Sequence, residues 1–316
     1  MAIEVVGSHR SDGAPTVNGR RRTLNRISVF SFVNTSVLIT MAALCVVPFV
    51  NLLALSVSSS PAVTAGRVSL WPVGFNLESY RFSVMSGGFS RAFVVSLQRV
   101  VVGVSVNMML TILVAFPLSK KRTAFRFRGA YAWFFMMTTL VQGGLIPLYM
   151  TVRFTGLLDS LAALILPTAV PVFNVIVLLN FFRTLPHELE ESAYIDGAGE
   201  WTILWRIFVP LSKPALATLT LYALVFHWNS WFDGLIYMNN PAKYPLQSYL
   251  QTIILTPESF FRAMSLSSDY AEFLGIVNAR TAKTSQIFIA AVPMLIVYPF
   301  LQKYFTKGLI LGSLKG

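Results

Sequence analysis

The sequence has 316 residues, of which 55% are hydrophobic and only 12% are charged, and its mean hydropathy is +0.64. Soluble domains carry about 25% charged residues, so this chain has too little polar surface to face water all round. The formal net charge of +12 could indicate nucleic-acid binding. Retention of basic residues on the cytoplasmic side and contact with anionic lipid explain it better. We therefore expect a membrane protein that does not bind nucleic acid.

Six apolar stretches are long enough to cross a bilayer, which takes roughly 20 residues. In chain order they are Val29–Val57, Ala92–Ser119, Ala130–Val152, Leu161–Phe182, Pro214–Asp233 and Thr284–Gln302. The long loop after the fifth contains YPLQSYLQTIIL, which predicts a short amphipathic helix. Four prolines inside the stretches, Pro167, Pro171, Pro293 and Pro299, are expected to kink or break their helices. The pattern predicts an all-α membrane protein with six transmembrane helices.

The basic residues predict the orientation of the chain. Residues 1–27 are basic and lack apolar periodicity, which predicts a disordered cytoplasmic tail. With the N-terminus inside, most of the 25 Lys and Arg residues fall in cytoplasmic segments, as the positive-inside rule requires. Both termini are then cytoplasmic, including the tail 303–316, and residues 28–316 form one six-helix domain. The first apolar stretch is too long for the apolar region of a cleavable signal peptide.

The motifs of common enzymes are missing from this sequence. It contains no GxxxxGK[ST] phosphate loop, no HExxH, no GxSxG and no CxxC, and it has one Cys and three His. We therefore expect neither catalysis nor a metal site. A protein of this kind moves or holds another molecule.

The loop 184–213, between the fourth and fifth stretches, is rich in acids. Five of the chain's 13 acidic residues lie within it, at Glu188, Glu190, Glu191, Asp196 and Glu200. Pro186 and the acids after it favour a helix start, Gly197-Ala198-Gly199 allows a turn, and Trp201–Phe208 forms a second segment that Pro210 ends. This predicts a cytoplasmic helix–turn–helix that docks into a groove on another protein. An ordinary amphipathic connector is the alternative.

This loop resembles the EAA loop of ABC importer permeases, whose pattern is E-A-A-x3-G-x9-I-x-L-P. Ser192 and Val209 depart from the pattern by small changes. The residues that match its key positions or its common D-G-A core are Glu191, Ala193, Asp196, Gly197, Ala198, Ile207 and Pro210.

Three further segments are similar to carbohydrate-uptake permeases. They are LVQGGLIPLYM (140–150), HWNSWFDGLIYMNN (227–240) and FTKGLILGSLKG (305–316), the last being similar to the tail of maltose-permease-like G subunits. The resemblance covers the chain from residue 28 onward. It is closest to the subgroup that contains the YtcP-like and lipoprotein-linked oligosaccharide permeases.

The resemblance implies the type I (MetI-like) importer permease fold in a bacterial cell membrane, with a cytoplasmic coupling helix. It also implies four kinds of contact: a second permease subunit in a heterodimer, two ABC ATPase subunits, an extracytoplasmic solute-binding protein that delivers oligosaccharide, and membrane lipid. ATP would bind to the ATPase subunits, so this chain would carry no cofactor. The docking surface would comprise Glu191, Ala193, Asp196, Gly197 and Ala198, anchored by Ile207 and Pro210, with Lys315 reaching the ATPases.

The substrate path is open to several interpretations. Arg99 is a charge inside a predicted span and hence a functional candidate, although it could also snorkel to the outer interface. Aromatic and polar side chains could bind sugar or could belong to an interfacial belt or to packing; the candidates are Gln142, Asn174, Trp228, Asn229, Trp231 and Asp233. A self-contained secondary transporter or channel for small polar solutes is the alternative function, and a membrane-embedded enzyme is a third.

Overall fold

The computed structural model describes residues 29–121, 123–255 and 277–313, with side chains described up to residue 300. The chain divides into two compact units, 1–47 and 48–316. The boundary lies inside the first helix, α1 (Val29–Ser56). Every described side chain of α1 from Phe30 to Val50 is exposed, and none of these residues is charged. Such a surface is stable only in an apolar surrounding such as lipid.

Helix α4 (Gly87–Ser119) is the axis of the larger unit. Its 33 residues span about 50 Å at 1.5 Å per residue, more than the roughly 30 Å hydrocarbon core. It begins ahead of the predicted Ala92 because the helix continues beyond its apolar segment. One stripe of α4 is buried and largely polar or small: Ser96, Arg99, Gly103, Asn107 and Thr111. The opposite face is apolar and exposed, which is the reverse of a helix in a water-soluble protein.

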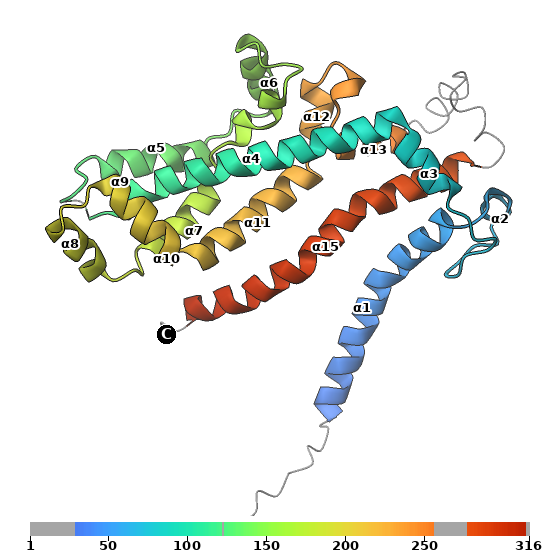
Figure 1. Ribbon diagram of the computed structural model, residues 1–316, viewed down its shortest axis with the longest axis horizontal. Helices are drawn as coiled ribbons and strands as arrows, with labels where there is room; N and C mark the ends of the chain where they lie inside the picture. The colour runs from blue at the N-terminus through green and yellow to red at the C-terminus, as the bar shows by residue number, and fades with distance from the viewer. Residues whose placement is uncertain (1–28, 122, 256–276, 314–316) are drawn as a thin grey trace, which may run out of the picture. The chain divides into compact units, whose positions relative to one another are not determined.

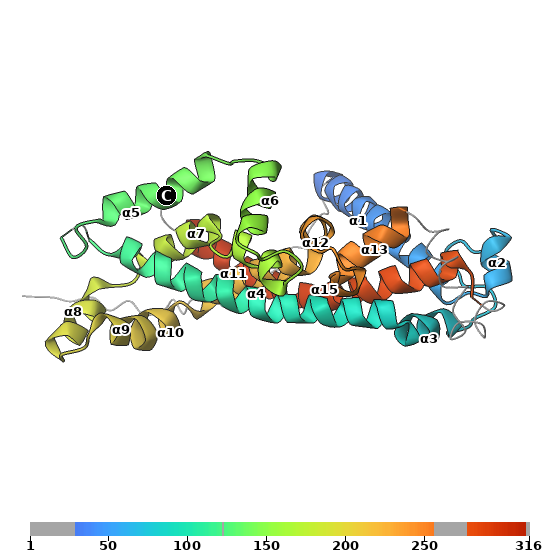
Figure 2. The same cartoon turned by 90° about the horizontal axis from the view of Figure 1, so that it is seen from above.

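Two helices pack along α4, namely α7 (Val172–Phe182) and α11 (Lys213–Asn229) (Figures 1 and 2). Where their ends meet, the rings of Phe116, Phe182 and Phe208 pack edge to face, with centroids 5.2–6.4 Å apart. This aromatic trio is the centre of the larger hydrophobic cluster. It fixes α4, α7 and the segment before α11 to one another.

Two of the predicted spans, Ala130–Val152 and Leu161–Phe182, are bent at a break. The prediction of one helix over Ala130–Val152 is wrong, because α5 (Arg128–Leu140) and α6 (Leu145–Phe154) meet at 116°. Gly144 at the break has φ +83°, a conformation that glycine adopts without strain.

The fourth span begins as two 3-10 turns, η1 (Leu161–Leu164) and η2 (Leu166–Thr168), which meet α7 at 52°. Pro167 and Pro171 lie at this break, as expected. A third bend, of 82°, joins the segment Glu200–Leu211 to α11 and lies before the predicted fifth span. That span was predicted to reach Asp233, but α11 ends at Asn229. The structure therefore has three helices long and apolar enough to cross a membrane, or up to six if each bent pair is one span, counted over the described residues.

The larger unit also contains the following helices. They are α2 (Ser60–Thr64), α3 (Glu78–Met85), α12 (Phe232–Tyr237), η4 (Pro241–Lys243), α13 (Leu246–Leu255) and α15 (Ala279–Ser313). The amphipathic helix predicted in YPLQSYLQTIIL is confirmed as α13. Helix α15 is continuous through Pro293 and Pro299, so neither proline breaks it. It packs against α11, α3 and α13.

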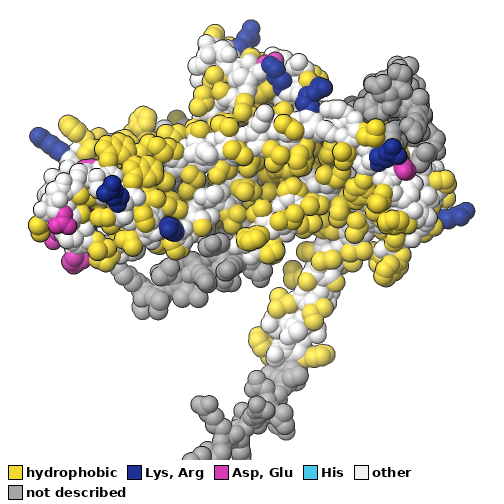
Figure 3. Space-filling model, viewed as in Figure 1, with side chains coloured by type: hydrophobic (Ala, Val, Ile, Leu, Met, Phe, Trp, Pro, Cys, Tyr) yellow, Lys and Arg dark blue, Asp and Glu magenta, His cyan; other side chains and the backbone are white. Residues whose placement is uncertain are grey.

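The surface shown in Figure 3 separates apolar from charged side chains. Apolar side chains cover the helices along their length, and acidic side chains gather at the end formed by α8 (His187–Ile195) and α9 (Glu200–Ile203). The acid-rich end contrasts with the apolar flanks. This distribution suits a bundle whose flanks contact lipid and whose ends contact water.

Candidate functional site

The loop 184–213 folds as two helices at an elbow, as predicted. Pro186 precedes α8, and Glu188 and Glu190 occupy the first turn of that helix, where the helix dipole favours acids. Gly197 then takes φ +77° and turns the chain into α9. The second limb continues through a π-helical turn, η3 (Leu204–Phe208), into α10 (Val209–Leu211). We call residues 187–211 the elbow.

The prediction that Pro210 ends the second segment is wrong. Pro210 lies inside α10, the last part of the continuous helical segment Glu200–Leu211. The limb ends at Leu211, one residue later.

The inner side of the elbow packs on the bundle. Ala193, Ile203, Leu204 and Phe208 are buried in the aromatic-trio cluster, and Ala198 and Ile207 are half-buried against it. The Ala198 N–H donates to the Ala193 carbonyl at 2.9 Å, which closes the turn. Of the predicted docking residues, Ala193 therefore faces inward.

The outer side of the elbow is exposed. Glu191, Asp196, Gly197 and Pro210 are all exposed, and nothing lies within 4 Å of where a Cβ on Gly197 would be. The side chain of Ile195, the last residue of α8, is 86% exposed. Lys315 lies outside the described residues.

Lys120, at the end of α4, joins the elbow to the bundle. Its Nζ donates to Glu190 Oε1 at 2.7 Å and lies 3.1 Å from Glu200 Oε2. Tyr194 donates its hydroxyl to Glu200 Oε1 and, at 3.4 Å, to Glu190 Oε1. Burial and the neighbouring Glu200 raise the pKa of Tyr194 above its ordinary value, so this hydroxyl remains a donor at physiological pH. Lys120 was not among the predicted residues, although its position after an apolar helix placed it opposite the acid-rich loop.

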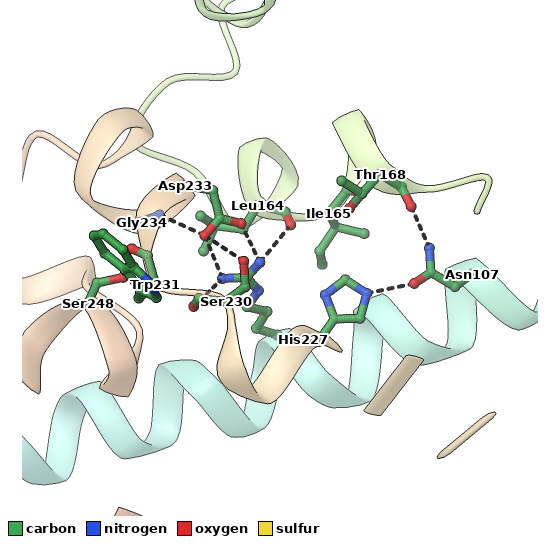
Figure 4. Close-up of polar contacts among 11 residues, drawn as sticks. Asn107, Leu164, Ile165, Thr168, His227, Ser230, Trp231, Asp233, Gly234 and Ser248 are labelled. Atoms are coloured by element: carbon green, nitrogen blue, oxygen red, sulfur yellow. Dashed lines mark hydrogen bonds and ion pairs between the residues drawn. The ribbon is translucent and has the colours of Figure 1, made fainter. Parts of the chain in front are cut away.

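A second polar cluster lies inside the bundle, between α4, the η1–η2 break and the end of α11 (Figure 4). Arg99 is fully buried and pairs with Asp233 through two hydrogen bonds. It also donates to the carbonyls of Ser230 at 3.3 Å and Leu164 at 3.4 Å. Asp233 further accepts from the Ser230 hydroxyl and the Gly234 N–H. Arg99 therefore does not snorkel; its ion pair with Asp233 and its bonds to two carbonyls link α4 to η1 and to the segment after α11.

Asn107 and His227 continue this buried polar network, which we define as Arg99, Asn107, His227, Ser230 and Asp233. The Asn107 amide donates to the carbonyls of Thr168 and Ala169, both at 2.9 Å. Its oxygen therefore accepts from His227 Nε2 at 2.7 Å, so the proton of that histidine is on Nε2. These bonds satisfy backbone carbonyls that the break in the fourth span leaves without helical hydrogen-bond partners. Backbone polar groups inside a membrane need such partners because no water is present.

The other substrate-path candidates do not join this network. Trp228 is buried among Phe89, Leu246 and Tyr249, and its indole N–H donates to the Ala290 carbonyl at 3.1 Å. Asn174 is buried on α7. Gln142, Asn229 and Trp231 are exposed. Of the predicted set, the structure thus brings together Arg99 and Asp233. The signal that could have found Asn107 is the polar stripe at helical spacing on α4.

A third cluster stabilises the loop after α12. Asp159 has φ +61° and accepts from the N–H groups of Asn239 and Asn240 and from Lys243 Nζ at 2.8 Å. These contacts hold the pKa of Asp159 below its ordinary value, with the Lys243 hydrogen bond as the main cause. Within the described ranges, no group of three or more His, Cys, Asp or Glu side chains could hold a metal ion.

Comparison with known proteins identifies the class to which this fold and elbow belong. Residues 85–311 match the family described as the binding-protein-dependent transport system inner membrane component. The chain belongs to this family of multi-pass membrane transport permeases.

Two proteins of known name are similar to this chain over most of its length. The chain is 38% identical over 279 residues to the polygalacturonan/rhamnogalacturonan transport system permease protein YtcP of Bacillus subtilis, covering 88% of this chain and 96% of the relative. It is also 38% identical over 289 residues to the protein LplC of the same organism, covering 91% and 95%.

Two solved structures share the fold. A chain of a bacterial ABC transporter involved in the import of the acidic polysaccharide alginate matches with a TM-score of 0.80 and 31% identity, over 89% of this chain and 98% of that chain. A second match, at 16% identity and a TM-score of 0.53, comes from a bacterial alginate ABC transporter in complex with its oligosaccharide-bound periplasmic protein. This second likeness concerns the fold alone.

Proposed function

We propose that this chain is one of two permease subunits of an ATP-driven importer that takes up oligosaccharides of acidic polysaccharides. An extracytoplasmic solute-binding protein delivers the substrate. Two ABC ATPase subunits bind the ATP and contact the elbow from the cytoplasm. Both termini lie on the same side of the membrane as the elbow. The observation that carries the proposal is the elbow itself, which presents Glu191, Asp196 and Gly197 outward while its inner side is fixed to the bundle. The proposal of an acidic substrate is supported by the relatives associated with pectic polysaccharides and alginate.

The docking role of the elbow is tested by the Gly197→Asp variant. At φ +77° a side chain is strained, but the added Cβ meets open space, so the protein should still insert. A carboxylate at the outer tip of the elbow would remove a close backbone contact with the ATPase. We expect co-purification of the ATPases with the tagged chain to be lost, together with uptake.

Gly66→Asp provides the matched control. Gly66 has φ +69°, and a Cβ added there would meet open space, as at Gly197, but it lies after α2, far along the chain from the elbow. It therefore carries the same backbone strain without the docking surface. If Gly197→Asp retains its ATPases, or Gly66→Asp loses them equally, the docking role is contradicted.

The substrate class is tested with the complete importer, purified through a tag on this chain together with its binding protein. We expect oligogalacturonate or alginate oligosaccharides to stimulate ATP hydrolysis and neutral malto-oligosaccharides not to do so. Stimulation by the neutral sugars alone would contradict the acidic class. Uptake into vesicles that lack the ATPases would instead support a secondary transporter or channel.

A further inference from the structure

Lys120 is an unusual lysine because its side chain is almost entirely buried at the surface end of a long helix. Its side chain is 7% exposed, whereas lysine is rarely buried unless it is paired. It lies at the C-cap of α4, where a cation is favoured by the helix dipole. That dipole alone would not require burial, so other contacts must account for the position of the ammonium group.

The carboxylates around Lys120 lie on opposite sides of the hinge in the elbow. Glu190 belongs to α8, before Gly197, and Glu200 is the first residue of α9, after it. The Lys120 ammonium contacts both, at 2.7 and 3.1 Å, and Tyr194 donates to both as well. One cation therefore links the two limbs of the elbow to each other and to the end of α4.

Aromatic rings cover the Lys120 ammonium group. The Lys120 Nζ lies 4.3 Å from the ring centroid of Phe116, 5.3 Å from that of Phe208 and 5.8 Å from that of Tyr194. Such contacts attract a cation, and low water access strengthens its hydrogen bonds to carboxylates. Without the cation, Glu190 and Glu200 would face each other as like charges and drive the limbs apart.

The surroundings also leave space for movement. Cavities of about 190 Å³ and 380 Å³ both have Lys120 in their lining, the first with residues of α8 and the second with Trp201 and Leu204 of the second limb. The limbs are thus held by the contacts at Lys120 together with the buried apolar side chains of the elbow, and close packing does not fill the space beside Lys120.

We propose that Lys120 is the positioning residue that transmits movement of the elbow to α4. This inference rests on the proposed docking of the ATPases at the elbow. Because Lys120 holds both limbs, a displacement of the elbow shifts the end of α4. The same helix carries Arg99 and Asn107 in its buried stripe, so the shift reaches the segments that surround the buried polar network.

The test uses the importer purified through a tag on this chain and reconstituted in liposomes with its binding protein. In the Lys120→Met variant, we expect the ATPases to remain bound and ATP to be hydrolysed, while the amount of substrate transported per ATP falls about tenfold. This factor matches the loss of one charge-assisted hydrogen bond. Lys121→Met is the matched control, because Lys121 is the exposed neighbour and should couple as the wild type does.

Two further variants separate positioning from simple stabilisation. Lys120→Arg keeps the cation and should restore most of the coupling. The double variant Lys120→Met with Glu190→Gln removes the repulsion between the two carboxylates and should recover part of the loss. Glu200→Gln alters a residue whose side chain is 55% exposed, so it should fold normally and still lower transport per ATP about threefold.

The outcomes distinguish this proposal from the docking proposal. If the ATPases no longer bind to Gly197→Asp but Lys120→Met and Glu200→Gln transport the wild-type amount per ATP, docking stands and the role of Lys120 is overturned. A loss in Lys120→Met that neither Lys120→Arg nor Glu190→Gln recovers also overturns it. If Lys120→Met fails to insert, Glu200→Gln alone decides, and wild-type coupling in that variant rejects the proposal.

Discussion

Arg99 and Asp233 show what a charge inside this bundle costs and what it holds in place. Taking an ion out of water is expensive, and the cost is recovered only when its partner and hydrogen bonds are complete. Here the guanidinium has a carboxylate and two backbone carbonyls as partners. Arg99 Nε has no hydrogen-bond partner among the described residues, and the Asp233 side chain is 21% exposed. The fully buried guanidinium therefore depends on its partner more than the carboxylate does.

This interdependence predicts the behaviour of single and double variants. Asp233→Asn alone should lower the free energy of unfolding by about 3–5 kcal/mol, because the fully buried Arg99 is left without its counter-ion. Arg99→Met should cost less, because the remaining Asp233 side chain is 21% exposed. The double variant should recover most of that loss. Thermal unfolding in detergent measures both effects, and Arg91→Met, an exposed arginine of the same helix, is the control. Single variants that unfold at the wild-type temperature would contradict the prediction.

Gly103 permits the close approach of α4 and His227. A Cβ at Gly103 would lie 2.6–2.9 Å from three atoms of the imidazole ring, so Gly103→Ala must displace His227 from Asn107. We expect a loss of about 1–3 kcal/mol, as is typical of overpacking. Gly129→Ala, in α5 with nothing within 4 Å, should be neutral or slightly stabilising. Unfolding curves of the two alanine variants that coincide would refute this role of Gly103.

At the scale of helices, hydropathy located the apolar segments but gave no information on whether each segment is straight or bent. Apolar composition over Ala130–Val152 predicts a span equally well whether the chain is straight or turns by 116°, as it does between α5 and α6. Gly143 and Gly144 permitted that turn without requiring it. The elbow was predictable because its acids, glycines and spacing all indicated the same structure. The network partner of Arg99 was not, because a contact across 134 positions leaves no local pattern.

The loop after α12 has a pH dependence that follows from Asp159. Because the folded-state pKa is lowered, the contact contributes stability above the unfolded value of 3.8 and loses it as the pH falls through the folded value. The loop should therefore stay protected from hydrogen exchange at neutral pH and down to about pH 4.

The Asp159→Asn variant isolates the charge, since asparagine also tolerates the left-handed backbone at φ +61°. We expect faster exchange of the Asn239 and Asn240 amides in this variant at neutral pH, measured by mass spectrometry. Equal protection in the wild type and the variant would show that the loop is held by its backbone alone.

At the scale of the whole molecule, the proposed orientation places the elbow in the cytoplasm. In a Cys45→Ser background, the Ile195→Cys and Trp71→Cys variants put single thiols on two highly exposed positions, 86% and 82% exposed, in different loops. A membrane-impermeant maleimide should label the variant at position 71 in whole cells and the variant at position 195 only in inside-out vesicles. The reverse labelling pattern would show that the chain has the opposite orientation in the membrane.

The break at residues 161–171 has a consequence for engineering. Its carbonyls at Leu164, Thr168 and Ala169 are satisfied by Arg99 and Asn107 of α4. A chimera that exchanges α4 with a relative, but keeps its own fourth span, would bury carbonyls against donors of another register. These two segments therefore constitute one transplantable module, and recombination between permeases should succeed only when they are inherited together.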